Sequence, residues 1–316
     1  MLRTGQHHTT HHTDIDASPD TVYRIIANAS AWPLSFAPTI HVEQTPLDAA
    51  TERLRIWATA NGEVKTWTSL RTLDADDRRI EFRQEVSSPP VAFMSGVWKV
   101  ESHAPGPLRL LLDHDFGAVD DAPDSVEWIK AATDRNSATE LANIKELAET
   151  ADAAAEATFD FEDSTLIQGD EDQVYRFLHE AAKWPERLPH VSRMRLREDV
   201  ENIQWMAMDT ITKDGSEHTT ESVRICLPQD RRIVYKQLVT PPLMATHIGR
   251  WTVRRTEDGV AATSWHGVRI NVSAIETVLG PDATIASARE FVRRAVGGNS
   301  AATLGLAKEF AEEHHG

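Results

Sequence analysis

Three side chains that could take part in binding or catalysis alternate along the predicted strand 66–72, namely Trp67, Ser69 and Arg71. Alternate residues of a strand share one face, so ring, hydroxyl and guanidinium are expected side by side. This row suits neither a solvent face nor a dry core, because burying an unpaired guanidinium is costly. It suits the wall of a half-buried cavity, in which the permanently charged arginine stabilises an anion. The alternative is a structural Arg71 that pairs with a carboxylate such as Glu85 or Asp115.

The same pattern recurs in the second half of the chain, where Ser222 and Arg224 follow the first pair by 153 residues and Thr220 replaces the tryptophan. Other members of the pattern recur as Trp32 and Trp184, Gln84 and Gln237, Trp98 and Trp251, and His114 and His266, with Met94 matched to Met244 after a small slip of the alignment. The repeat predicts two related cavities with unequal aromatic lining. The fuller set in the first half favours that cavity for the more demanding step.

Other candidates for chemistry have weaker support. His114, between two aspartates, could be a tuned acid or base or a structural histidine, and Gln84 could line the cavity or form a cross-strand hydrogen bond. The single cysteine, Cys226, has Leu73 as its counterpart, which argues against a nucleophile. No metal-ligand motif and no glycine-rich phosphate loop is recognised, so we expect neither a metal nor a cofactor.

The elements that must position these residues follow one plan in each half. A β-leaning run at 9–16 precedes Ser18-Pro19, a helix start, and strands separated by turn signals fill 40–119. A long helix begins at Pro123, and the last helix of the chain is expected over 285–312. This order predicts an α+β fold of two tandem helix-grip domains. Each has a curved antiparallel sheet wrapped around a long C-terminal helix, with an internal cavity.

The period of the repeat is too long for a solenoid and indicates a duplicated domain. We expect an N-terminal domain at 1–150, a helix-favouring linker at 151–157 and a C-terminal domain at 158–316. The offset between matching residues of the two copies increases toward the C-terminal end of each copy, which places an insertion of about ten residues in the second copy, within 271–284.

Composition narrows the class of protein. The net charge of −16 argues against nucleic acid as a partner. One cysteine, no signal peptide and no long apolar run predict a cytoplasmic protein that is not a membrane protein.

Taken together, these residues resemble the di-domain aromatase/cyclases of bacterial type II polyketide synthases, of the START-like helix-grip superfamily. The resemblance rests on Trp32-Pro33, Trp67-x-Ser69-x-Arg71, Pro89-Pro90-Val91 with Met94, Gly96-x-Trp98, the segment 134–137 and the segment 240–244. It implies Arg71, Ser69, Arg224 and Ser222 as catalytic residues. It implies a substrate-binding set of Trp32, Phe36, Trp67, Gln84, Met94, Trp98, His114, Trp184, Met244, Trp251 and His266.

The resemblance also implies the reaction: first-ring aldol closure of a poly-β-ketone, typically between carbons 7 and 12, followed by dehydration to an aromatic ring. The expected partners are an acyl carrier protein that bears the phosphopantetheine-tethered chain and the other synthase subunits. The carrier is acidic, so a basic docking surface is expected on this chain. Candidates are Arg187, Arg193, Arg195, Arg197, Arg289, Arg293 and Arg294, which could instead be solvated surface.

The family mechanism does not follow directly for this chain, for two reasons. Single-domain relatives have a tyrosine near the first Trp-Pro helix as proton donor, whereas the stretch 34–39 reads Leu-Ser-Phe-Ala-Pro-Thr here. Helix-grip domains can also serve as carriers or chaperones of hydrophobic ligands without catalysis. In a third hypothesis one domain is catalytic and the other is a scaffold.

Overall fold

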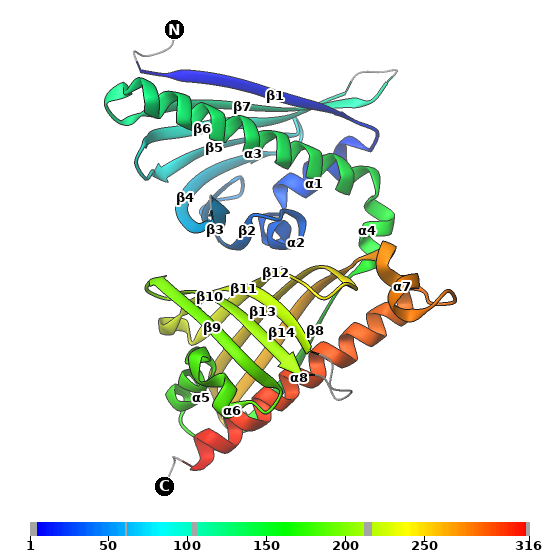
Figure 1. Cartoon of the computed structure of the whole chain (residues 1–316). Coiled ribbons are helices and arrows are strands. Elements are labelled where there is room, and N and C mark those ends of the chain that lie inside the picture. The colour runs from blue at the N-terminus through cyan, green and yellow to red at the C-terminus, as the bar shows by residue number, and fades with distance from the viewer. Residues whose placement is uncertain (1–4, 61, 103–105, 212–216, 314–316) are drawn as a thin grey trace. The chain divides into compact units, whose positions relative to one another are not determined.

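The structure, a computed structural model, describes residues 5–60, 62–102, 106–211 and 217–313. The chain divides into two compact units, Met1–Asp152 and Ala153–Gly316 (Figure 1).

The first unit is a seven-stranded antiparallel sheet in the order β1-β7-β6-β5-β4-β3-β2. Its elements are β1 (His7–Ile15), α1 (Pro19–Ala27), a 3-10 turn (Ala29–Ala31), α2 (Trp32–Ser35), β2 (Thr39–Pro46), β3 (Thr51–Ala60), β4 (Glu63–Asp74), β5 (Arg79–Val86), β6 (Val91–Glu101), β7 (Leu108–Ala118), a 3-10 turn (Val119–Asp121) and α3 (Pro123–Glu149). The long helix α3 packs against β1 and β7, and α4 (Ala151–Ala157) leads into the second unit.

The second unit repeats this plan with the strand order β8-β14-β13-β12-β11-β10-β9. Its elements are β8 (Thr158–Ile167), α5 (Glu171–His179), a 3-10 turn (Ala181–Lys183), α6 (Trp184–Arg187), β9 (Val191–Val200), β10 (Ile203–Ile211), β11 (Glu217–Leu227), a 3-10 turn (Pro228–Asp230), β12 (Arg232–Val239), β13 (Met244–Thr256), β14 (Gly259–Ile270), a 3-10 turn (Val272–Ala274), α7 (Ile275–Leu279) and α8 (Ile285–Glu313). The α+β fold of two tandem helix-grip domains is confirmed.

Local sequence signals explain where the helices begin. The hydroxyl of Ser18 accepts a hydrogen bond from the Thr21 backbone N–H at 3.1 Å, and Asp170 caps α5 in the same way. These caps satisfy backbone donors that the first helical turn leaves without partners. The inner face of α3 then buries Leu141 and Ile144 against the sheet.

The predicted insertion is confirmed. In the first unit β7 ends at Ala118 and α3 begins at Pro123, whereas β14 ends at Ile270 and α8 begins only at Ile285. The added residues form the last 3-10 turn and α7, which is anchored by the buried side chain of Ile275.

One predicted correspondence between the halves is wrong. The register pairs Gly96 with His114 and Gly249 with His266, so residues of β6 and β13 correspond at the spacing of the two glycines. By this register His247, not Met244, is the counterpart of Met94, and Met244 corresponds to Val91. Both strands have a register shift at their start, so the irregularity is shared and no slip of the alignment is needed.

Candidate active site

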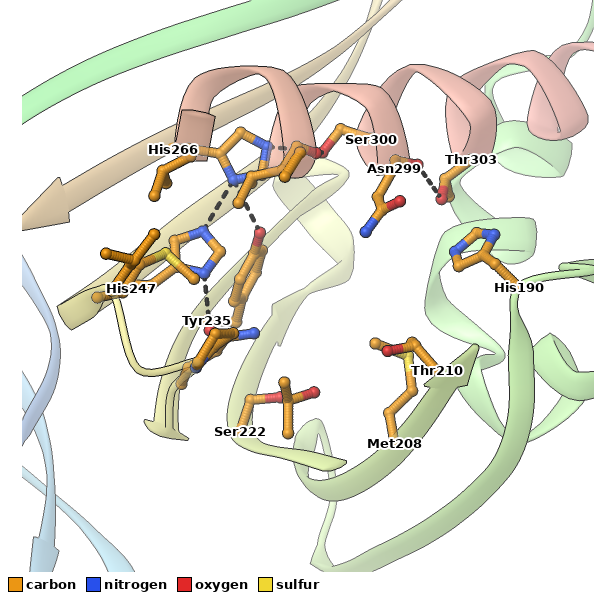
Figure 2. A pocket seen from close by; sticks show the side chains of 18 of the residues that line it. His190, Met208, Thr210, Ser222, Tyr235, His247, His266, Asn299, Ser300 and Thr303 are labelled. Carbon is orange, nitrogen blue, oxygen red and sulfur yellow. Dashed lines mark hydrogen bonds between the residues drawn. The ribbon is translucent and has the colours of Figure 1, made fainter. Parts of the chain in front are cut away.

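A cavity of about 450 Å³ lies in the second unit between the sheet and α8 (Figure 2). Its rim includes Val278 of α7 and Phe291 of α8, which are both 42% exposed. The six candidate residues of the second half all line this cavity: Trp184, Ser222, Arg224, Met244, Trp251 and His266.

A continuous row of residues crosses five strands beneath this cavity. The register joins Gln204, Arg224, Tyr235, Gly249 and His266, each opposite the next. Residues that are directly opposite on neighbouring strands hold their side chains about 5 Å apart on the same face. The row therefore brings a guanidinium, a phenol and an imidazole together.

Arg224 is a buried cation without a carboxylate partner. Its side chain, 1% exposed, lies under the Trp184 ring at 5.0 Å. Nη2 donates to the Leu178 carbonyl at 2.5 Å, but Nε and Nη1 have no hydrogen-bond partner among the described residues. Its cross-strand neighbour is the neutral Gln204, which donates to Glu198 at 2.9 Å. Burial lowers the pKa of Arg224, yet a guanidinium stays protonated in proteins.

A hydrogen-bonded network stands beside this arginine. His266 Nδ1 lies 3.0 Å from His247 Nε2 and 3.2 Å from the Tyr235 hydroxyl, and His266 Nε2 lies 2.7 Å from the Ser300 hydroxyl (Figure 2). His247 Nδ1 lies 2.9 Å from Gln237 Oε1. Burial lowers the pKa of His247 to about 3 and that of His266 to about 4, so both imidazoles are neutral at pH 7.

Gly249 makes this network possible. A Cβ at this position would lie 2.2 Å from Cζ of the Tyr235 ring and 2.3 Å from its hydroxyl oxygen. The ring therefore lies directly over the glycine. With no side chain in between, the phenol on β12 reaches across β13 to His266 on β14.

The first unit has the same row with different partners: Glu52, Arg71, Phe82, Gly96 and His114. Phe82 lies over Gly96 as Tyr235 lies over Gly249, since a Cβ there would be 2.5 Å from the ring. Without a hydroxyl, however, it cannot bond His114, and His114 Nδ1 has no hydrogen-bond partner in the described part of the chain. Burial lowers the pKa of His114 to about 4.

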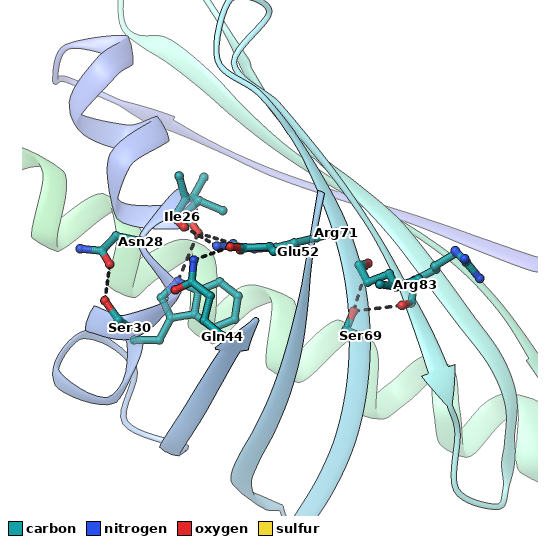
Figure 3. A network of polar contacts seen from close by, with 11 residues as sticks. Ile26, Asn28, Ser30, Gln44, Glu52, Ser69, Arg71 and Arg83 are labelled. Carbon is teal, nitrogen blue, oxygen red and sulfur yellow. Dashed lines mark hydrogen bonds and ion pairs between the residues drawn. The ribbon is translucent and has the colours of Figure 1, made fainter. Parts of the chain in front are cut away.

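All three side-chain nitrogens of Arg71 have a partner within its own domain. Nε pairs with Glu52, while Nη1 donates to the Ile26 carbonyl at 2.9 Å and Nη2 to the Ala27 carbonyl (Figure 3). Its ring neighbour is Trp32 at 5.1 Å. The guanidinium thus fastens the C-terminal end of α1 to the sheet.

The carboxylate that holds Arg71 differs from both proposed partners. Glu85 pairs with Arg53 at 2.6 Å, and Asp115 pairs with His8 at 2.9 Å. Glu52 is opposite Arg71 on β3, a neighbour that only the strand register reveals.

The other first-half candidates gather around this row. Ser69 is buried and donates to the Arg83 carbonyl at 3.1 Å (Figure 3), and Gln84 Nε2 lies 3.9 Å from the Met94 sulfur. The aromatic candidates Trp32, Phe36, Trp67 and Trp98 all pack against core clusters of this unit.

Several polar residues of these sites were not predicted from the sequence. They are Glu52, Glu140, Gln204, Tyr235, His247 and Ser300. The exchanges Glu52 to Gln204, Phe82 to Tyr235 and Met94 to His247 were visible in the repeat as changes from one polarity to another. Glu140 projects from α3 at the position of Thr303, which lines the second cavity, and burial raises the pKa of Glu140 to about 7.

Other features bear on the remaining expectations. Burial raises the pKa of Cys226 to about 11, which makes its thiol a poor nucleophile. Within the described ranges, no group of three His, Cys, Asp or Glu side chains is arranged to hold a metal ion, and no helix has the length and apolarity to cross a membrane.

The fold and the two equivalent rows define a START-like protein with two tandem helix-grip domains. The family model for polyketide cyclase/dehydrase and lipid transport proteins matches residues 6–149. The chain is 43% identical to the granaticin polyketide synthase bifunctional cyclase/dehydratase of Streptomyces violaceoruber, over 97% of this chain and 94% of the relative. It is 42% identical to the actinorhodin counterpart of Streptomyces coelicolor, over 96% of both chains.

Solved structures agree with these relatives. The di-domain aromatase/cyclase BexL of the BE-7585A pathway is 49% identical, with a TM-score of 0.88 over 97% of this chain and 99% of that one. StfQ of the steffimycin pathway is 32% identical, with a TM-score of 0.84 over 98% of both chains. The chain therefore belongs to the family of bifunctional, di-domain polyketide cyclase/dehydratases, which are enzymes, and the resemblance inferred from the sequence is confirmed.

Proposed function

We propose that this enzyme closes the first ring of a carrier-bound poly-β-ketone, between carbons 7 and 12, and removes water to give an aromatic ring. The names of the relatives support the class of pathway, because they belong to the granaticin and actinorhodin polyketide synthases. The reaction requires an enolate for carbon–carbon bond formation and a proton donor for loss of the hydroxyl group.

The proposal rests on the buried charge of Arg224, which no carboxylate among the described residues balances. Negative charge develops on a carbonyl oxygen as the enolate and then the alkoxide form. Donors fixed in advance around that oxygen are worth most in a water-poor site. Nε and Nη1 of Arg224, which have no partner among the described residues, are buried nitrogens of a side chain that lines the cavity. Because these nitrogens are themselves covered, Arg224 would act on a substrate oxygen in the cavity through its uncompensated charge.

The lining fits the remaining needs of ring closure. Trp184, Met244 and Trp251 present apolar surface that folds a flexible chain and brings two carbons together, which supplies the proximity contribution. Ser222 would hydrogen-bond a second oxygen of the chain. This cavity is the better candidate for anion chemistry, although the sequence favoured the first.

The first unit has a more limited role in this proposal. The charge of Arg71 is balanced by Glu52, and three of its donors are used within the protein. Arg71 therefore contributes little to an external anion. We propose that the first unit binds the substrate chain but does not stabilise its charge. The residues assigned to this binding are Ser69, Gln84, Met94, His114 and the aromatic residues Trp32, Phe36, Trp67 and Trp98.

The acidic carrier protein is proposed to dock on β9. Arg193, Arg195 and Arg197 alternate along this edge strand and are all exposed, so they present one basic stripe. Arg197 also pairs with Asp199 at 3.3 Å, so Arg193 and Arg195 are the main candidates. Of the other candidates, Arg187 pairs with Glu180 at 2.6 Å, Arg293 pairs with Asp163 at 2.7 Å and Arg289 donates to the Glu156 carbonyl, whereas Arg294 is exposed on α8. Replacing Arg193 and Arg195 by glutamate should weaken carrier binding. Wild-type affinity that did not fall at raised salt would contradict docking by charge.

Reconstitution with a minimal polyketide synthase tests the proposed function. Arg224→Met keeps volume but removes the charge, and we expect the rate of ring-closed product to fall by about 100- to 1,000-fold, as for loss of an oxyanion donor. Arg71→Met is the matched control, expected to lower stability more than turnover of the folded fraction. A purely carrier function would leave the ratio of ring-closed to shunt products unchanged in both variants.

A further inference from the structure

We propose that Tyr235 is the proton donor for the loss of water in the second cavity, with His266 and His247 as residues that position its hydroxyl. This inference rests on the proposed function of that cavity. It identifies a phenol donor on β12, far in the sequence from the Trp-Pro helix where no tyrosine is present.

The polarity of the network follows from its chemistry. A neutral imidazole has one N–H donor and one acceptor nitrogen. Since the amide oxygen of Gln237 faces His247 Nδ1 at 2.9 Å, that nitrogen donates, and His247 Nε2 is left as an acceptor. His266 Nδ1 must then be the donor toward it, over 3.0 Å.

This polarity determines the role of the phenol. The Tyr235 oxygen lies 3.2 Å from the same Nδ1–H of His266, so it accepts from that group and cannot donate to it. Its own O–H proton is not used by the network and is available to a ligand. Tyr235 lines the cavity, so a substrate hydroxyl can approach that proton.

The other end of the network is fixed as well. With Nδ1 protonated, His266 Nε2 is an acceptor with one lone pair, which the Ser264 hydroxyl at 2.9 Å can fill. The Ser300 hydroxyl lies 2.7 Å from the same nitrogen and donates its single proton to the Val296 carbonyl at 3.1 Å. Stacking on Phe161, with ring centroids 4.9 Å apart, holds the imidazole plane. Stacking thus fixes the plane of the His266 ring, while the contact from Gln237 through His247 assigns the proton to Nδ1.

The surroundings match the needs of a general acid. Burial raises the pKa of Tyr235 above its ordinary value, so the hydroxyl keeps its proton until reaction, while the nearby Arg224 acts in the opposite direction. As negative charge grows on the phenol oxygen, the His266 N–H and the Arg224 cation both stabilise it. Arg224 is directly opposite Tyr235 in the register, so its charge lies beside the phenol that a substrate in the cavity would meet.

The step balances as follows. The carbonyl next to the reacting carbon is stabilised by the charge of Arg224, and the proton on that carbon passes to a water molecule in the cavity. The electron pair of the C–H bond forms the C=C bond as the neighbouring C–O bond breaks. The leaving hydroxyl takes the Tyr235 proton and departs as water, and solvent water returns a proton to the tyrosine.

The test replaces Tyr235 by phenylalanine in the full-length enzyme within the reconstituted synthase. Phenylalanine is the residue that the first unit carries over Gly96, so the ring should be accommodated. We expect ring-closed product that retains its water to accumulate, because water loss slows by about 100-fold or more, as for removal of a general acid. Mass spectrometry of the products measures the ratio of hydrated to dehydrated species.

Tyr175→Phe is the matched control, because Tyr175 is a half-buried tyrosine of the same unit that is not among the residues lining the cavity and whose buried hydroxyl lacks a partner among described residues. It should dehydrate as wild type does. Wild type that gives no ring-closed product refutes the proposed function. Wild type and Tyr235→Phe that dehydrate equally fast refute only the role of Tyr235.

The positioning role is tested separately with His247→Met, which copies the residue of the first unit. We expect kcat for water loss to fall about tenfold with KM unchanged, and His247→Gln, which keeps an acceptor toward His266, to restore most of it. A purely structural role would not give rescue that depends on the acceptor. If Tyr235→Phe does not fold, His247→Met decides: unchanged water loss overturns the proposal.

Discussion

The two domains carry the same five-strand row with opposite electrostatics. In the first, Glu52 balances Arg71 and an apolar ring lies between that arginine and His114. In the second, a neutral Gln204 faces Arg224, and a phenol links the arginine to an imidazole network. Single exchanges at two positions thus separate a guanidinium that is paired with a carboxylate from one that has no such partner among the described residues. The comparison shows that a shared motif does not imply a shared role.

The largest expected effect comes from unbalancing the first row with Glu52→Gln, the residue of the second. Removing one partner of a buried ion pair costs about 3–5 kcal/mol, because the other charge is left uncompensated. Hydrogen exchange measured separately for each domain should show the loss in the first unit alone. Equal destabilisation of both units would mean that Glu52 does not act through Arg71.

The reciprocal change, Gln204→Glu, should make the second row resemble the first. A carboxylate opposite Arg224 would neutralise the cation that the substrate anion needs. We expect turnover to fall by about 10- to 100-fold, a smaller loss than for removing the arginine itself. The second unit should remain at least as stable as in wild type. Full activity in a variant with a formed ion pair would contradict the proposed role of Arg224.

The units should also differ in how stability changes with pH. His247 and His266 have folded-state pKa values of about 3 and 4, below the ordinary histidine value, so the unfolded chain binds protons that the folded domain does not. Their contribution is complete above about pH 6.5 and is lost as the pH falls toward 4. Each such histidine contributes a slope of about 1.4 kcal/mol per pH unit.

The first unit has one such histidine and one group of opposite sign. His114, with a folded-state pKa of about 4, makes the first unit more stable as the pH rises. Glu140, with a folded-state pKa of about 7, makes the unit less stable as the pH rises from the ordinary glutamate pKa toward 7. Between pH 4.5 and 6.5 these two slopes oppose each other. Acid titration followed by domain-resolved exchange should weaken the second unit first, and His247→Met should reduce its slope.

The smallest predicted effect is a gain. Phe82→Tyr would place a hydroxyl near the unpartnered Nδ1 of His114, in the arrangement that Tyr235 and His266 already show. One added hydrogen bond contributes about 0.5–1.5 kcal/mol, so the unfolding midpoint of the first unit should rise by a few degrees. Tyr23→Phe is a convenient control because Tyr23 lies on α1, outside the row. A lower midpoint would show that the ring cannot keep its position.

Much of the fold could be predicted because its signals are local. Ser18 with Pro19 marks the start of the first helix, and the spacing of the repeat locates the insertion. The pairing of Arg71 could not be predicted, since Glu52 is its neighbour only through the register of β3 and β4. The match of Met94 with Met244 failed for the same reason: identical residue type was a weaker guide than the register of a bulged strand.

The polar network was also beyond the sequence, although its signal was present. Tyr235 and His247 have no identical counterpart in the first copy, so the residues that the two copies share do not identify them. The residues that differ between the copies at equivalent positions, such as Phe82 and Tyr235, carried the information about which cavity is polar.

The inserted segment 271–284 has a consequence for how such enzymes diversify. The two copies differ most in length where the last strand joins the long helix, and in the second unit α7 places Val278 at the rim of the cavity. Loop length can vary at this junction without disturbing the strands that hold the reactive groups. The fold therefore places the cavity rim and the polar residues of the sheet on different segments, so that the width of the entrance can evolve while the polar residues are kept.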